Sequence, residues 1–368
     1  MKIALLGFGT VGSHFYKLCE GRSDLQITAV LSRRPRPELT CTVTADFDEI
    51  VRDPSIDIVV EVMGGVEPAY SYLCAAMRAG KHVVTANKQL MCARFDALTA
   101  LSKEMGVALR CTAAAGGGIP WLTSLSRASQ LDEITAVEGI LNGTTNYMLS
   151  AMTNSGADYA AALQKAQELG YAEADPTADV EGLDARRKLV LSADLAFGVN
   201  IKEEDIPCVG ISSITAADIA RAKEEGLTYK LIARAEKSGS AVAAFVCPTL
   251  FPSSAPEAHT DGTGNLATLY AARFGRQSFS GAGAGGYPTG SSVLRDCLDI
   301  ADGCRSFYAD SFVPRPVNLS GMQGKWLFRC MGEYFVRECS AREAFNAYDS
   351  YRKNDPHALL ARYAVDEE

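Results

Sequence analysis

Histidine is scarce in this chain, and its scarcity limits the chemistry that the protein can carry out. The 368 residues include only 4 histidines, which lie far apart at positions 14, 82, 259 and 357. No H-E-x-x-H motif is present, so a zinc site of that type is excluded. A nucleophilic triad that depends on histidine is disfavoured for the same reason.

Long apolar runs and a positive net charge are also missing. No apolar segment approaches the roughly 18–20 residues that are needed to span a bilayer. The apolar N-terminal run is too short and too rich in glycine for a secretory signal. The formal net charge of −8 disfavours non-specific binding to nucleic acid. We therefore expect neither a membrane nor a nucleic acid as a partner.

The cysteines show no sign of a disulfide framework. There are 11 of them, an odd number, and no C-x-x-C pair. Several fall among apolar residues, as small reduced core residues do. This usage is typical of a reducing compartment and predicts a cytoplasmic protein. The chain is long enough for two domains.

A glycine motif follows the first predicted strand, residues 2–6, and precedes a helical apolar pattern. In this setting Gly7 permits a tight turn, Gly9 lets a pyrophosphate approach the backbone, and Gly12 allows close packing of helix and strand. The helix N-terminus offers free N–H groups to the phosphates. The spacing G-x-G-x-x-G predicts a dinucleotide site that is formed by Gly7, Phe8, Gly9, Thr10, Val11 and Gly12.

The end of the second predicted strand, residues 26–31, bears on the choice of cofactor. An Asp or Glu at this point usually binds the ribose hydroxyls of NAD. This chain has Arg33 and Arg34 there instead. Because arginine pairs well with a phosphate dianion, the pair favours NADP over NAD. The alternative is that both arginines are solvated loop residues.

Strands and helices continue to alternate along the first part of the chain. Strands are expected at residues 57–62, 82–85 and 107–111, with helices near 68–79 and 95–105. Such alternation predicts a parallel, doubly wound sheet of the Rossmann type, and hence an α/β fold.

Two loops of this predicted sheet carry candidate ligand-binding residues. Gly64 follows one strand, Thr85 is the last residue of the next strand, and Lys88 follows that strand. Ligands bind at the carboxyl ends of the strands in such sheets, so we expect all three residues at the cofactor. Lys88 could instead be an ordinary surface lysine.

The pattern changes after about residue 125. Strands are expected at 133–141, 229–235 and 242–246, with helices near 158–169, 181–197 and 215–226. This order predicts an α+β domain with a mostly antiparallel sheet, one face of which is open to a second copy, as in a homodimer. The predicted domains are 1–125 for the dinucleotide, 126–285 for substrate and dimerisation, a helix that returns to the first domain at 286–312, and a short segment of unknown role at 313–368.

Residues 168–197 concentrate charge in a helical pattern. Asp184 and Lys188 are four residues apart, so both project from one face of the predicted helix. A lysine among carboxylates stays charged and can give a proton to an oxygen anion as it forms, while nearby acids can hold a substrate ammonium group. The alternative is a solvated surface pair that contributes about 0.3–0.5 kcal/mol.

Taken together, the motifs resemble those of the homoserine dehydrogenase family from residue 1 to about 302. Their order along the chain is the family's order. They are G-F-G-T-V-G at 7–12, T-A-N-K at 85–88, G-G-G-I-P at 116–120, N-G-T-T-N-Y at 142–147, G-Y-A-E-A-D-P-T-A-D-V-E-G-L-D at 170–184, and G-A-G-A-G-G-Y-P-T-G at 281–290.

The resemblance implies a reaction and a role for each matching residue. The family interconverts L-aspartate 4-semialdehyde and L-homoserine with NAD(P)H, in the biosynthesis of threonine, methionine and isoleucine. Lys188 matches the lysine that protonates the aldehyde oxygen, and Asp184 matches the acid that holds the substrate. The remaining matches are Glu173 and Asp179 as further acids, Lys88 as a second active-site lysine, and Gly283 and Gly285 as glycines that close over the nicotinamide.

The chain departs from the family at a cation-binding loop and at its C-terminus. Thr112 stands where the family usually has a glutamate, although Ala115, Gly117 and Ile119 could still offer main-chain carbonyls to a monovalent cation such as Na⁺. The tail is too short for a complete ligand-sensing ACT domain. Two rival interpretations are another NAD(P)-dependent amino-acid dehydrogenase of the same architecture and a non-catalytic NADP-binding sensor.

Overall fold

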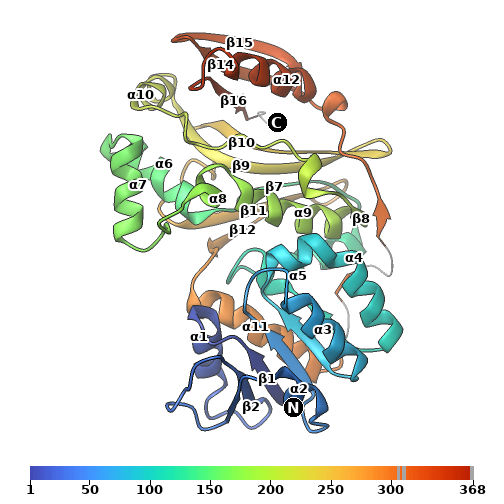
Figure 1. The fold of residues 1–368 in the computed structure, drawn as a ribbon. Coiled ribbons are helices and arrows are strands. Elements are labelled where there is room, and N and C mark those ends of the chain that lie inside the picture. Colours follow the sequence, from blue (N-terminus) through green and yellow to red (C-terminus); the bar gives the residue numbers. More distant parts are fainter. Residues whose placement is uncertain (305–306, 309–311, 365–368) are drawn as a thin grey trace. The chain divides into compact units, whose positions relative to one another are not determined.

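The computed structural model describes residues 1–304, 307–308 and 312–364, and these form two compact units. Unit 1 comprises Met1–Gln130 and Ala282–Phe312, and unit 2 comprises Leu131–Gly281 and Val313–Glu368 (Figure 1). The domain boundaries expected after residues 125, 285 and 312 stay predictions. In the described part of the chain, no helix is both long and apolar enough to cross a membrane.

Unit 1 is built on a six-stranded sheet in the order β3-β2-β1-β4-β5-β6, and its neighbouring strands pair in parallel. The central strands are continuous apolar runs because helices cover both of their faces. The strands are β1 Lys2–Leu6, β2 Gln26–Leu31, β3 Thr42–Thr44, β4 Ile58–Glu61, β5 His82–Thr85 and β6 Leu109–Arg110.

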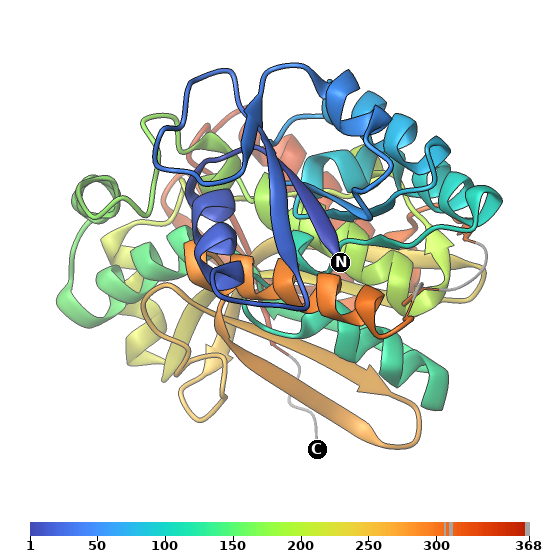
Figure 2. The same ribbon diagram turned by 90° about the horizontal axis from the view of Figure 1, so that it is seen from below.

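The helices of unit 1 include one that returns from far along the chain. Helix α11 packs against α1, and both contribute to the same apolar core (Figure 2). Helix α4 begins at Lys88, where Asn87 caps it, and is interrupted at Arg94 by a non-helical backbone conformation. The helix expected near residues 95–105 therefore corresponds to the second part of α4. Helix α11 begins at Gly286. The helices are α1 Thr10–Cys19, α2 Phe47–Arg52, α3 Ala69–Arg78, α4 Lys88–Met105, η1 Thr112–Ala114, α5 Trp121–Leu131 and α11 Gly286–Ala301.

Unit 2 is built on an eight-stranded sheet in the order β12-β11-β7-β9-β10-β16-β14-β15. Strands β7, β9, β10, β11, β14 and β15 pair antiparallel, whereas β10 and β16 pair in parallel. The strands are β7 Ile134–Ile140, β9 Leu227–Ser238, β10 Ala241–Pro252, β11 Gly264–Ala271, β12 Gly275–Ala282, β14 Gln323–Cys330, β15 Glu333–Ser340 and β16 Leu359–Tyr363, with a separate short pair, β8 Val199–Asn200 and β13 Val313–Pro314. The expected fold class, a doubly wound parallel sheet with a mostly antiparallel second sheet, is confirmed.

The sheet of unit 2 is covered on both faces. Helix α9 packs against β7 and β9 on one face. On the other, Phe245 lies in an apolar cluster with α12, and Phe251 lies in a second cluster with the loop at residues 253–263. The face expected to be open to a second copy is therefore partly covered by the chain itself. The helices are α6 Gly143–Ser155, α7 Tyr159–Glu168, α8 Thr177–Val180, α9 Leu183–Phe197, η2 Glu203–Asp205, α10 Ala216–Glu224, η3 Leu319–Gly321 and α12 Ala341–Arg352.

Candidate functional site

The glycine turn between β1 and α1 has the geometry that its sequence predicts. Gly7 has a φ of 99°, which L side chains rarely adopt. A Cβ on Gly12 would lie 2.3 Å from the Gly7 carbonyl oxygen, so no larger residue fits there. A Cβ on Gly9 would meet nothing within 4 Å, which leaves the backbone open to a ligand. Thr10 and Val11 form the first turn of α1.

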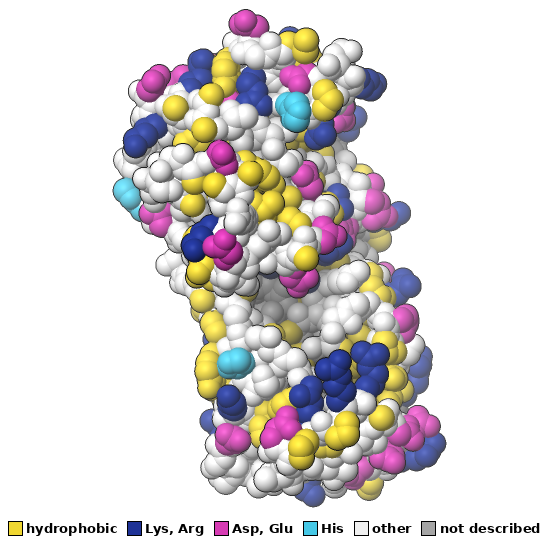
Figure 3. All heavy atoms as spheres, turned by 60° about the vertical axis from the view of Figure 1, so that its left-hand side comes forward, with side chains coloured by type: hydrophobic (Ala, Val, Ile, Leu, Met, Phe, Trp, Pro, Cys, Tyr) yellow, Lys and Arg dark blue, Asp and Glu magenta, His cyan; other side chains and the backbone are white. Residues whose placement is uncertain are grey.

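A cavity of about 890 Å³ opens beside this turn, within unit 1. Several predicted cofactor residues share its wall, namely Gly7, Phe8, Gly9, Arg33, Arg34 and Gly64. The volume is in the range of a site for a large organic ligand. Although the net charge of the chain is negative, lysine and arginine side chains gather on part of the molecular face shown in Figure 3.

Arg36 also lines this cavity and was missed by the sequence analysis. Its guanidinium lies 5.2 Å from the centre of the Phe8 ring and donates a hydrogen bond of 3.3 Å to the Phe8 carbonyl oxygen. Arg33 and Arg34 are exposed, whereas Arg36 is half-buried. The signal that could have identified it is the run R-R-P-R, in which a third arginine closely follows the other two.

Glu61, at the end of β4, ties together the loops in which Gly64 and Thr85 lie. Its buried carboxylate accepts hydrogen bonds from the Thr85 hydroxyl at 2.5 Å, the Met63 amide at 2.6 Å and the Gly64 amide at 3.2 Å. Burial raises the pKa of Glu61, and these hydrogen bonds oppose the rise. The Thr85 hydroxyl is thus engaged within the protein. Lys88 is half-buried at the first position of α4.

The two glycine-rich segments of unit 1 lie against each other. A Cβ on Gly117 would come within 2.4 Å of the Gly283 carbonyl group, and the Gly118 amide donates to the Ala282 carbonyl at 3.0 Å. Gly285 has a φ of 121° and precedes α11 directly. Close backbone approach therefore accounts for glycine at 117, and a backbone conformation unfavourable to other residues accounts for it at 285.

The residues proposed for a monovalent cation are buried and electrically neutral. The carbonyl of Gly117 accepts from the Ser292 hydroxyl at 2.6 Å, and that of Ile119 accepts from the Trp121 amide at 2.7 Å. The Thr112 hydroxyl is buried without a hydrogen-bond partner among the described residues, and Ala115 is buried as well. Among the residues that the structure describes, no group of three His, Cys, Asp or Glu could hold a metal.

In unit 2, Lys188 and Asp184 form a buried pair on α9 rather than a solvated one. The Lys188 Nζ lies 2.8 Å from Asp184 Oδ2 and donates a hydrogen bond of 2.6 Å to the Leu141 carbonyl. The two residues are 7% and 6% exposed. The surface-pair interpretation is therefore wrong, because solvent does not surround either group. Asp184 also lies in the first turn of α9, where a negative charge is favoured by the helix dipole.

Asn142 joins this pair to a third predicted residue and was missed as a site residue. Its side-chain amide donates to Asp184 Oδ2 at 3.0 Å and to Asp179 Oδ1 at 2.7 Å. Its side-chain oxygen accepts from the Thr145 amide at 2.9 Å, which caps α6. The first asparagine of the N-G-T-T-N-Y motif therefore caps a helix with its side-chain oxygen and holds two carboxylates together with its amide group.

Glu173 does not join this cluster. Its side chain is exposed, and among the described residues no hydrogen bond or ion pair links its carboxylate to Asp179, Asp184 or Lys188. Arg187, which is adjacent to Lys188 in the sequence, pairs with Glu203 at 3.2 Å. The structure therefore brings together Asp179, Asp184 and Lys188, and leaves Glu173 outside.

Family models match both the region of the glycine turn and the region of the Lys188–Asp184 pair. A family model described as "Homoserine dehydrogenase, NAD binding domain" matches residues 7–111, and one described as "Homoserine dehydrogenase" matches residues 120–298. The chain is 40% identical over 319 residues to a homoserine dehydrogenase of Bacillus subtilis (strain 168). The aligned region covers 83% of this chain and 74% of the relative. The chain belongs to the homoserine dehydrogenase family.

Solved structures of homoserine dehydrogenases share the fold. That of the enzyme from Thiobacillus denitrificans matches with a TM-score of 0.90 and 27% identity, over 99% of this chain and 98% of that one. A hyperthermophilic archaeal homoserine dehydrogenase in complex with NADPH matches with a TM-score of 0.69 and 22% identity, over 81% and 96% of the two chains. The expected activity, an oxidoreductase acting on a CH–OH group, is confirmed, and neither rival interpretation is favoured.

Proposed function

We propose that this homoserine dehydrogenase uses Lys188 as the proton donor and NADPH as its preferred cofactor to interconvert L-aspartate 4-semialdehyde and L-homoserine. The observation that carries the proposal is the buried Lys188 ammonium beside Asp184. The direct test follows NADPH absorbance with the semialdehyde, or NADP⁺ reduction with L-homoserine. Absence of turnover with both substrates would contradict the proposal.

The ammonium group of Lys188 is prepared for proton donation. It carries three N–H groups. Leu141 and Asp184 supply oxygens for two of them, and no third partner is present among the described residues. NADPH, when bound, supplies hydride to the aldehyde carbon. The third N–H then donates its proton to the aldehyde oxygen, so that negative charge does not build up on that oxygen. Asp179 and Asp184 hold the substrate ammonium group, and Lys88 is the second active-site lysine.

NADPH preference is expected to depend on arginines beside the glycine turn. Arg33→Ala and Arg34→Ala are each expected to raise the KM for NADPH roughly 10-fold or more, because each removes a charge-assisted contact with the 2′-phosphate. The KM for NADH is expected to stay within twofold. Arg52→Ala is the matched control, since this arginine is exposed on α2. Equal use of NADH and NADPH, unaffected by the substitutions, would contradict the assignment.

Asn142→Ala is expected to raise the KM for the semialdehyde more than it lowers kcat, because the two carboxylates lose the amide that positions them. The substitution also removes a helix cap, and such a cap contributes about 1 kcal/mol to the free energy of unfolding. Asp158→Ala is the matched control, because Asp158 caps α7 through the Ala161 amide and has an exposed side chain. Steady-state kinetics and thermal unfolding are measured on both variants. An equal KM for the semialdehyde in Asn142→Ala and Asp158→Ala would mean that Asn142 acts only as a helix cap.

Three further features belong to the proposal. The neutral oxygens of Thr112, Ala115, Gly117 and Ile119 suit a monovalent cation such as Na⁺ better than a divalent one, because they supply no negative charge to offset the larger charge of a divalent ion. The protein is a cytoplasmic homodimer. Strand β12 supports the dimer, since it forms one edge of its sheet and is largely exposed, and an exposed edge can pair with a second chain. Light scattering coupled to gel filtration tests the dimer.

A further inference from the structure

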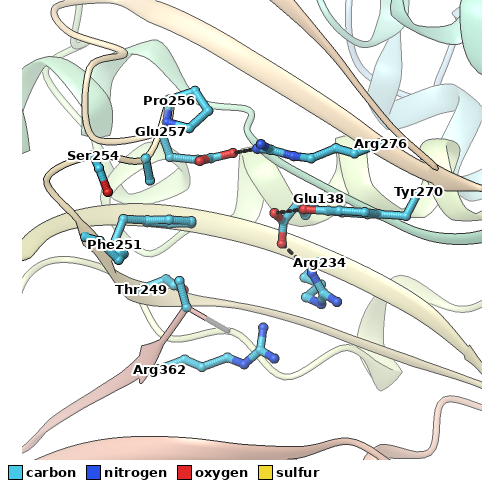
Figure 4. A pocket seen from close by; sticks show the side chains of 13 residues that line it. Glu138, Arg234, Thr249, Phe251, Ser254, Pro256, Glu257, Tyr270, Arg276 and Arg362 are labelled. Atoms are coloured by element: carbon cyan, nitrogen blue, oxygen red, sulfur yellow. Dashed lines mark hydrogen bonds and ion pairs between the residues drawn. The ribbon is translucent and has the colours of Figure 1, made fainter. Parts of the chain in front are cut away.

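A second cavity lies within unit 2, on the face of the sheet opposite α9, and none of the proposed catalytic residues lines it. Its volume is about 200 Å³. Strands β7, β9, β10, β11, β12 and β16 contribute to its wall, and Ser254, Pro256 and Glu257 of the 253–263 loop overhang it (Figure 4).

Two of the three arginines at this cavity have carboxylate partners. Arg234 pairs with Glu138 at 2.6 Å and with Glu236 at 3.1 Å. Arg276 pairs with Glu257. The Tyr270 hydroxyl donates to the remaining oxygen of Glu138 at 2.6 Å. Each carboxylate that faces the cavity is therefore already engaged.

The third arginine, Arg362 of β16, has no such partner. It is only 4% exposed, its Nε makes no hydrogen bond, and no carboxylate forms an ion pair with it among the described residues. In Figure 4 its guanidinium extends toward that of Arg234. Burial and the nearby charge of Arg234 lower the pKa of Arg362, whereas the charges of Glu138 and Glu236 raise it. Both of those carboxylates are paired with Arg234, and the Arg362 guanidinium otherwise lies 5.8 Å from the centre of the Phe245 ring. Because a guanidinium keeps its proton, the structure holds a buried cation whose neighbouring carboxylates are already engaged.

An unpaired buried charge is strongly unfavourable unless a counter-ion approaches it. We propose that this cavity binds a small oxyanion, a carboxylate or a phosphate, through the guanidinium of Arg362. The planar fork of arginine matches both groups. The volume admits an ion of that size and excludes a nucleotide. Phe251 and Pro256 add apolar wall, which suits a small organic carboxylate as well as an inorganic ion. The proposal is independent of the proposed catalytic mechanism.

The test measures thermal unfolding of the full chain, dialysed into chloride buffer, against sodium phosphate and sodium acetate at constant ionic strength. At about 100 times the dissociation constant, a specific anion is expected to raise the Tm by roughly 5 °C. The two arms distinguish a phosphate from a carboxylate, and titration calorimetry gives the stoichiometry expected for one site per chain.

Arg362→Gln is expected to abolish the rise in Tm while keeping turnover within twofold of the parent. Its Tm in chloride alone is expected to equal or exceed that of the parent, since an unpaired buried cation has been removed. Arg362→Lys keeps the charge without the fork and is expected to weaken binding about 10-fold. If Arg362→Gln does not fold, this variant carries the test. Arg52→Gln, on the exposed surface of unit 1, is the control and is expected to keep the full rise.

Three results would overturn the proposal. An equal rise with every salt, or in both Arg362 variants, would mean a general ionic effect. Anion binding that appears only in a chain ending at Ala364 would mean that the acidic sequence at 365–368 already fills the site. No anion effect, with a dimer that dissociates more readily when Arg362 is replaced by Gln, would mean that a second copy supplies the carboxylate.

Discussion

Replacement of Lys188 by methionine is expected to lower kcat by roughly 10²–10⁴-fold while NADPH binding is unchanged, because this is the usual contribution of a positioned general acid. Methionine retains most of the side-chain length but has no proton to donate. The glycine turn and the cavity of about 890 Å³ belong to unit 1, whereas Lys188 lies in unit 2, so the substitution leaves the nucleotide site intact. Stopped-flow absorbance with the semialdehyde measures the rate, and NADPH fluorescence measures binding.

Two controls separate chemistry from stability in this experiment. Lys188→Met leaves Asp184 buried without its cation, which destabilises the fold. The double variant Lys188→Met/Asp184→Asn removes both charges and is expected to restore the Tm but not the turnover. Lys165→Met removes an exposed lysine of α7 and is expected to change neither quantity. Turnover within twofold of the parent in Lys188→Met would end the assignment of Lys188 as the proton donor.

Asp296→Ala is expected to lower the free energy of unfolding by about 3–5 kcal/mol, because it breaks a buried ion pair from one side. Asp296 is fully buried on α11, where it accepts from Arg110 Nε at 3.1 Å and from the Thr112 amide at 2.9 Å. Burial raises the pKa of Asp296 although Arg110 opposes the shift, so the charged carboxylate depends on this arginine. The pair anchors α11 to the end of β6 and thereby supports the contact between Gly117 and Gly283.

Urea unfolding measures the loss of stability, and hydrogen exchange locates it. Peptides from α11 are expected to lose protection first, while peptides from β9 and β10 serve as an internal control in unit 2. Asp302→Ala, on the exposed residue that follows α11, is expected to cost less than about 0.5 kcal/mol. Asp296→Ala combined with Arg110→Met removes both charges of the pair and should recover part of the loss. An unchanged midpoint in Asp296→Ala would mean that apolar packing alone holds α11 in place.

Local signals were sufficient for the glycine turn and for most elements of unit 1. Strands β1, β4 and β5 are each followed by a loop and then a helix, so short-range periodicity identifies them. The same reasoning missed β11, Gly264–Ala271, and shortened β10, Ala241–Pro252, to residues 242–246. Strand β11 pairs with β7, which is far away in the sequence, and pairing of that kind leaves little trace in local periodicity. Strand β10 forms a hairpin with its neighbour β9 and is buried along almost its whole length between β9 and β16, so it lacks the alternation that marks the ends of a half-exposed strand.

The amino-acid sequence by itself determined the family, the parallel and antiparallel sheets, and the two residues of the Lys188–Asp184 pair, because spacing and residue type are local properties. Only the tertiary structure decided that this pair is buried, that Asn142 bridges Asp184 to Asp179, and that Glu173 lies outside the cluster. It also left Arg362 buried without a carboxylate partner among the residues that the structure describes. The physical reason is that burial and partnership depend on which strands and helices meet in three dimensions, and those contacts join residues that are remote in sequence.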